Sequence, residues 1–210
     1  MITEESCTII VNANQFYPTL LTKTWLVENN IIPENDIENY LNGNGISQIK
    51  CANFFLTMLP NQVSFSIIND LDKKDIHLLL NCINALERVQ FLTAGINFAY
   101  SSPLSNDVTK NLSREKYFFT NSKVHSLFDN EDAKFGVYLS KNFHGTRLKL
   151  EILPSLVQSL KNPLPREVLS FTYNYHKILD PNNNKQDLLE FIDDAQSFQD
   201  NSREIMNSII

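Results

Sequence analysis

The tract Leu59-Pro60-Asn61-Gln62-Val63-Ser64-Phe65-Ser66 carries the clearest fold signal in the chain, and Leu164-Pro165-Arg166-Glu167-Val168-Leu169-Ser170-Phe171-Thr172 echoes it. Each tract leads from Leu-Pro through a polar pair into a strand-like run, which an acidic turn and an amphipathic helix follow. In the first tract the apolar residues alternate with polar ones, a period of two that is typical of a strand with one buried face. The copies lie about half a chain apart, which indicates either two related halves or a chance match of simple patterns.

Outward from this tract, six elements are predicted in the first hundred residues. They are a strand over 7–11, a helix over 19–30, strands over 48–58 and 62–68, a helix from 72, and a strand over 93–100. Asp72 and Asp75 are placed to cap the second helix, and Ile37, Tyr40 and Leu41 are expected to add a helical turn before the second strand. This order is that of a ferredoxin-like plait, βαββαβ, over residues 1–102.

The rest of the chain predicts a connector and a related βββα half. Residues 103–133 are irregular, with a short helix expected within 107–118. A hairpin over 135–143 and 147–153, a loop or helical turn over 154–165, a strand over 168–178 and a closing helix over 185–208 are expected to form the second half, 134–210. The predicted fold class is therefore α+β, an antiparallel sheet with helices on one face.

The charge of the chain argues against nonspecific nucleic-acid binding. The net charge is −6 and the sequence pI about 5.2, whereas affinity for phosphates needs a basic field. A local basic patch around Lys141, Arg147, Lys149 and Lys161 keeps nucleic acid open as an alternative partner.

Targeting and cysteine signals indicate a cytoplasmic protein. The acidic start predicts no signal peptide, and no apolar run approaches the ~18 residues of a membrane span. The three cysteines, Cys7, Cys51 and Cys82, are widely spaced in apolar stretches and are expected to be buried free thiols in a reducing compartment. No membrane association is expected.

Catalytic motifs are not found in the sequence. There is no phosphate loop, GxGxxG, HExxH or GxSxG pattern, and no Cys/His set with metal-ligand spacing. With 5 glycines in all, a glycine-rich phosphate cradle is disfavoured. We therefore expect no catalytic residues, metal or cofactor, and the sequence favours a protein that is not an enzyme.

The candidate binding residues cluster on the last predicted strand. In Tyr173-Asn174-Tyr175-His176, the tyrosines share one face of a strand while Asn174 and His176 share the other, about 7 Å apart. Asn97 sits in the returning strand as a polar residue at the centre of a sheet, and His144 lies three residues before Arg147. These residues either line a binding groove, or the rings pack under a helix and the polar groups simply face water.

A family resemblance rests on the element order, on Ala94-Gly95-Ile96-Asn97-Phe98-Ala99-Tyr100 and on the ending from Gln199 to Ile210. These features resemble an uncharacterised, sporadically distributed bacterial protein family with a comparable strand and a closing helix rich in Phe and Ile. The resemblance spans most of the chain, departs from the family at the N-terminus and carries over no catalytic residue. Its patchy distribution is compatible with accessory genes such as anti-phage defence.

Three functions follow as hypotheses. The first is a non-catalytic adaptor or scaffold subunit of a bacterial multi-protein system. The second is an RNA- or DNA-binding or processing factor that uses His144, Arg147, Asn174 and His176. The third is self-association through an open sheet edge, because each predicted half leaves an edge strand unpaired.

Overall fold

The computed structural model describes residues 4–68, 70–103, 114–130, 133–159 and 162–209. The strands are β1 Glu4–Ala13, β2 Asn39–Gly43, β3 Ile46–Lys50, β4 Phe54–Leu59, β5 Gln62–Ile67, β6 Phe91–Pro103, β7 Val137–Phe143, β8 Thr146–Ser159 and β9 Asn162–Ile178. The helices are η1 Pro18–Leu20, α1 Lys23–Glu28, η2 Glu34–Asp36, α2 Lys73–Ala85, α4 Lys123–Ser126, α5 Asn184–Asp193 and α6 Ala195–Asn207.

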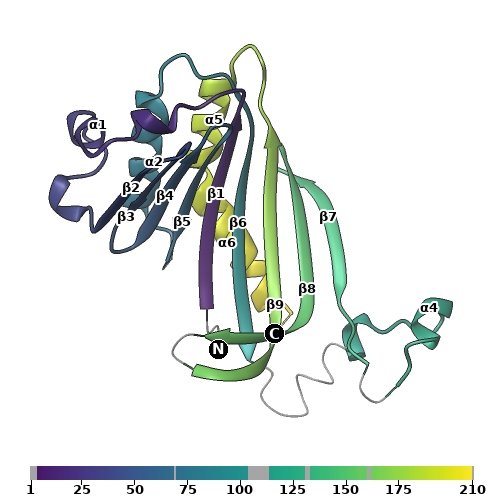
Figure 1. The fold of residues 1–210 in the computed structure, drawn as a ribbon. Coiled ribbons are helices and arrows are strands. Elements are labelled where there is room, and N and C mark those ends of the chain that lie inside the picture. Colours follow the sequence, from purple (N-terminus) through teal and green to yellow (C-terminus); the bar gives the residue numbers. More distant parts are fainter. Residues whose placement is uncertain (1–3, 69, 104–113, 131–132, 160–161, 210) are drawn as a thin grey trace.

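All nine strands form one antiparallel sheet in the order β2-β3-β4-β5-β1-β6-β9-β8-β7. Helices α2, α5 and α6 lie on one face of this sheet, behind it in Figure 1. The structure therefore confirms the α+β class and the antiparallel sheet with helices.

Strict alternation along the strands builds the core between this face and the helices. In β5, Val63, Phe65 and Ile67 are buried while Gln62 and the serines between them are half-buried on the opposite face. The period of two seen in the sequence is thereby confirmed. The same alternation in β1 buries its odd-numbered residues from 7 to 13.

Several predicted boundaries in the first half are wrong. The single strand expected over 48–58 is the hairpin of β3 and β4, and the helical turn expected around Tyr40 is the edge strand β2. The helix expected over 19–30 is reduced to η1 and the six-residue α1. The ferredoxin-like half is not confirmed as a unit, because its strands belong to one nine-stranded sheet.

The two Leu-Pro tracts occupy different structural positions. Pro60 and Asn61 form the tight turn between β4 and β5, whereas Pro165 lies inside the long strand β9. The internal duplication is not confirmed. The loop expected over 154–165 is also wrong, because β8 continues to Ser159 and β9 begins at Asn162. Pro154 is tolerated there because β7 pairs with β8 only as far as Ile152, so no neighbour on that side needs its missing N–H.

The second half follows the predicted order of elements. β7 and β8 form the expected hairpin, and its two-residue turn has positive φ at His144 (45°) and Gly145 (72°), as a type I′ turn requires. The expected closing helix is two helices that meet at Asp194. β6 pairs with β9 from Thr93 to Pro103, so strands from before and after the expected connector are neighbours in the same sheet. The part of the expected connector helix over 107–113 lies outside the described residues.

The start of α2 confirms the predicted cap and supports a stability prediction. Asp72 Oδ1 accepts hydrogen bonds from the backbone N–H of Lys74 (2.7 Å) and Asp75 (3.0 Å), and Asp75 Oδ2 accepts one from the Asp72 N–H (3.2 Å). We expect Asp72→Ala to lower the free energy of unfolding by about 1 kcal/mol, measured by urea denaturation, because the N–H groups of Lys74 and Asp75 lose their hydrogen-bond acceptor. Asp72→Asn keeps an acceptor and is expected to cost little, so an equal loss in both variants would contradict the capping role.

Candidate functional site

The face of the sheet opposite α2, α5 and α6 carries a row of hydrogen-bonded polar side chains across its centre. Pairing places Thr8 (β1) opposite Asn97 (β6), Asn97 opposite Asn174 (β9), and Asn174 opposite Lys149 (β8). The Asn174 side-chain amide donates to Asn97 Oδ1 at 2.6 Å, and the Asn97 amide donates to the Thr8 carbonyl at 3.2 Å. Two asparagines from strands 77 residues apart are thus held rigidly side by side.

The next row adds a histidine and an arginine to this arrangement. His176 of β9 lies opposite Arg147 of β8 on one side and opposite Gly95 of β6 on the other. A Cβ at Gly95 would lie 3.6 Å from the Asn174 amide nitrogen and 4.0 Å from that of Asn97, so a side chain at this position would contact both asparagines. We name Asn97, Asn174, His176, Arg147 and Lys149 the open-face patch.

A hollow of about 380 Å³ adjoins the open-face patch at the end of the β7–β8 hairpin. It is lined by Asn142, Gly145, Thr146, Arg147, His176 and Ile178. Within it the Arg147 guanidinium donates to Asn142 Oδ1 at 3.1 Å. This bond orients the guanidinium while leaving most of its donors available to a ligand.

The electrostatics of the patch differ from those of the whole chain. Arg147 and Lys149 are exposed and form no ion pair with any residue that the structure describes. Glu151 follows Lys149 on the same face of β8, and no carboxylate lines the hollow. On a chain of net charge −6, this corner therefore offers cations and amides to an acidic or polar partner.

The two tyrosines of the predicted cluster face the core instead. Tyr173 and Tyr175 are fully buried, and the Tyr175 hydroxyl lies 2.9 Å from Ser202 Oγ on α6. Burial raises the pKa of both hydroxyls. The predicted separation of faces is confirmed, since Asn174 and His176 lie on the open face, but the tyrosines are structural.

His144 is not part of the patch. It occupies the hairpin turn, where its ring stacks on Phe143 with centroids 4.2 Å apart and planes 9° apart. The predicted basic patch is also divided. Arg147 and Lys149 point to the open face, Lys141 lies on the helix-covered side of β7 beside Ile205 of α6, and Lys161 lies outside the described residues.

The chemistry of the patch is suited to recognition. The His176 imidazole makes no hydrogen bond with any described residue, so nothing orients it as a general base toward a hydroxyl or thiol. Burial raises the pKa of the Cys7 and Cys82 thiols to about 12, which keeps both protonated and unreactive at neutral pH. No group of three or more His, Cys, Asp or Glu residues that could hold a metal ion occurs in the part of the chain that the structure describes.

Thr8, Gly95 and Asn142 belong to this site and were not singled out from the sequence. Thr8 shows the same period of two, since it alternates with the buried Cys7 and Ile9, whereas Gly95 and Asn142 carry no such signal. Which strands are neighbours cannot be read from that period, so the closeness of Gly95 to the two asparagines is visible only in the folded sheet.

No protein-family model matches the chain, and no curated protein is detectably similar to it. The resemblance to a sporadic bacterial family stays a prediction. Across the described helices, none is both long and apolar enough to cross a membrane.

Proposed function

We propose that this chain is a non-catalytic adaptor or scaffold subunit that binds a protein partner through the open-face patch. The observation that carries the proposal is a sheet with helices on one face (Figure 1) and, on the other face, a preordered patch of hydrogen-bonded amides and exposed cations. The bacterial resemblance extends the proposal to a multi-protein accessory system such as anti-phage defence.

Preorganisation of the asparagines supports a binding role. Their amides are fixed by hydrogen bonds to each other and to the β1 backbone, so little side-chain entropy is lost when a partner binds. Arg147 adds a planar fork that matches carboxylates, and charged residues at such positions increase both specificity and the rate of association. An acidic or amide-rich segment lying across β8, β9 and β6 fits this surface.

A nucleic-acid strand is the second candidate for the same face. Arg147 and Lys149 form no ion pair with the residues that the structure describes, and they lie two residues apart on β8, a spacing that suits consecutive phosphates. The aromatic residues that stack bases on other sheet platforms are not found at the patch, where the neighbours are asparagines, a glycine and a histidine. The protein partner is therefore preferred.

The experiment is affinity purification from the native host with wild-type and charge-reversed baits. We expect Arg147→Glu with Lys149→Glu to reduce recovery of the bound partner at least about tenfold, because two attractive contacts become repulsive. The matched control reverses Lys23 and Lys73, which are exposed on the first turns of α1 and α2, and changes the net charge equally.

Three outcomes separate the candidates. A protein lost only with the patch variant supports the adaptor. Nuclease-sensitive, salt-sensitive RNA or DNA lost with the same variant supports the second function. A partner that binds the patch variant as well as wild type would show that the open face is not the interface.

A further inference from the structure

The free edge of β7 is the second unpartnered feature of the sheet. Among the described strands β7 pairs with β8 alone, in an unbroken register from Val137 to Phe143. It carries two exposed hydrophobic side chains, Tyr138 (56% exposed) and Leu139 (50% exposed), and it contains no proline. An edge of this kind can pair with another strand unless something blocks it.

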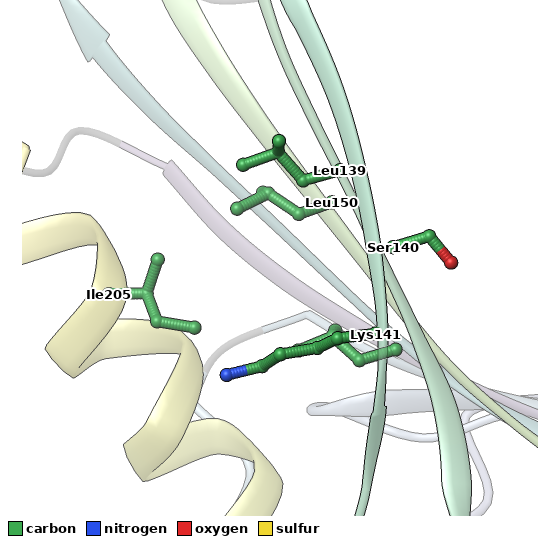
Figure 2. A pocket seen from close by; sticks show the side chains of 6 residues that line it. Leu139, Ser140, Lys141, Leu150 and Ile205 are labelled. Carbon is green, nitrogen blue, oxygen red and sulfur yellow. The ribbon is translucent and has the colours of Figure 1, made fainter.

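An apolar hollow of about 290 Å³ lies beside this edge, between the sheet and α6. In Figure 2, Leu139 and Leu150 point toward Ile205 of α6, the Lys141 chain extends toward the same helix, and Ser140 points the other way. Lys141 is the one ionisable side chain in the lining. A strand added to β7 would therefore extend the apolar face over this hollow.

The hairpin turn determines which backbone groups of β7 are free. A two-residue turn closes on a hydrogen-bonded pair, here Phe143 and Thr146. The odd-numbered residues of β7 then point their N–H and C=O groups at β8, and Tyr138, Ser140 and Asn142 point theirs outward. No described side chain bonds these outward N–H groups.

The opposite edge of the sheet is blocked by its own side chains. β2 also ends in a two-residue turn with positive φ, at Asn44 and Gly45, so the N–H of Tyr40 points outward. Asn39 Oδ1 already accepts a hydrogen bond from that N–H at 2.8 Å, and the Asn42 amide donates to the Tyr40 hydroxyl at 2.7 Å. β7 has no comparable protection and is the edge that can pair.

We infer that two copies of this chain associate through β7, antiparallel, with a two-fold axis at Ser140. This is the register in which every residue of β7 finds a partner, and it pairs the outward groups of Ser140 with each other and those of Tyr138 with Asn142. On the helix side Val137 lies opposite Phe143, and Leu139 opposite the aliphatic stem of Lys141. The two apolar hollows then meet at the axis.

Charge selects this register over its neighbour. Pairing centred on Lys141 would place two ammonium groups directly opposite each other, which is destabilising. The register centred on Ser140 separates them diagonally, and it joins the exposed Leu139 and the apolar hollow of one copy to those of the other. The occupant is therefore a second copy, independent of the partner proposed for the open face.

The test is sedimentation velocity of the purified chain across a wide concentration range. We expect a species of twice the 24.2 kDa chain mass, and at least about a tenfold rise in its dissociation constant with Leu139→Lys, which places an ammonium group directly opposite Lys141 of the second copy. Ser140→Pro removes an outward N–H without touching the β8 ladder and is expected to give a folded monomer by circular dichroism. Asn42→Pro, at the blocked β2 edge, is the matched control and should leave the dimer intact.

Cross-linking tests the register itself. Ser140→Cys is expected to form a disulfide-linked dimer on mild oxidation, since residues facing each other across such an axis lie within disulfide reach. Asn142→Cys, which faces Tyr138 in this register, should not, and the native cysteines are buried. A monomer at every concentration, a Ser140→Pro dimer as stable as wild type, or a cross-link at 142 in place of 140 would each overturn the inference.

Discussion

Tyr175→Ala is expected to lower the free energy of unfolding by about 3–5 kcal/mol, the largest single-residue loss predicted for this fold. The Tyr175 ring stacks on Phe198 of α6 with centroids 4.7 Å apart and planes 17° apart, and it meets Phe98 and Phe143 edge-on. Its side chain is fully buried at the junction of β6, β9 and α6. The substitution removes this contact and leaves a cavity where α6 packs on the sheet, as urea denaturation would show.

The neighbouring tyrosine provides a matched comparison for the hydroxyl. Tyr175 Oη bonds Ser202 Oγ (2.9 Å) and accepts from the Asn201 amide (2.7 Å), so Tyr175→Phe is expected to cost about 1–2 kcal/mol. The buried Tyr173 hydroxyl has no hydrogen-bond partner among the described residues, and its ring packs edge-on against Tyr100. Tyr173→Phe is therefore expected to be neutral or slightly stabilising. Equal losses in the two Phe variants would contradict this assignment.

The strands that the sequence predicts well are those with one buried and one open face. β5, the first half of β8 and the centre of β9 each show a clear period of two, and α2 shows both its cap and its apolar stripe. The sequence does not predict β2 as a strand, because an edge strand exposed on both faces has no such period. β3 and β4 merge into one predicted strand because the turn at Cys51-Ala52-Asn53 contains neither Gly nor Pro.

Long strands explain the remaining error in the fold. Prolines at 154 and 165 are ordinarily evidence against a central strand, yet β8 and β9 extend past the ends of β7 and β6, where missing N–H groups leave no ladder bond unmade. The sequence therefore predicts that these two strands end near the ends of β7 and β6. It does not predict the part of β8 and β9 that extends beyond them.

The sequence predicts which residues of each strand face the candidate site, but it does not predict which strands lie next to one another there. The sequence places Asn174 and His176 on one face and treats Asn97 as a central polar residue, and both placements are confirmed. That β6 and β9 are neighbours depends on contacts between residues 77 positions apart, which no local period encodes. His144 was included because it is near Arg147 in sequence, whereas the turn directs it away from the patch. The binding role of the patch stays a prediction.

Alkaline pH is expected to unfold this protein, with stability falling steeply above about pH 9. Burial raises the pKa of Cys7 to about 12, with the Asp75 charge adding to the effect, and burial alone raises that of Cys82 to about 12. Both thiols are almost fully inaccessible, at 2% and 0% exposed. In the unfolded chain each thiol has its ordinary pKa of 9.0. Between about pH 9 and 12 the folded chain therefore keeps a proton on each thiol that the unfolded chain releases.

The sign of the effect follows from linkage between proton binding and folding. Below the unfolded pKa the thiols are protonated in both states and stability is independent of them. As the pH rises from 9 toward 12, the unfolded chain releases protons that the folded chain retains, so each thiol removes about 1.4 kcal/mol of unfolding free energy per pH unit. Burial also raises the pKa of Tyr100 and Tyr173, which steepens the fall above pH 10. Since domains are stable by about 5–15 kcal/mol, unfolding is expected between about pH 10 and 12.

Matched variants distinguish this mechanism from general charge repulsion. Unfolding free energies measured in reducing buffer from pH 7 to 12 should fall less steeply for Cys82→Ala than for wild type, because one of the protons that the folded chain retains is gone, even though the variant starts from lower stability at pH 7. Tyr17→Phe removes a hydroxyl from a residue that is 59% exposed, and this variant should keep the wild-type slope. Repulsion among the surface charges of an acidic chain would lower stability equally in all three proteins. A slope in Cys82→Ala identical to wild type would therefore show that the buried thiols do not set the alkaline limit.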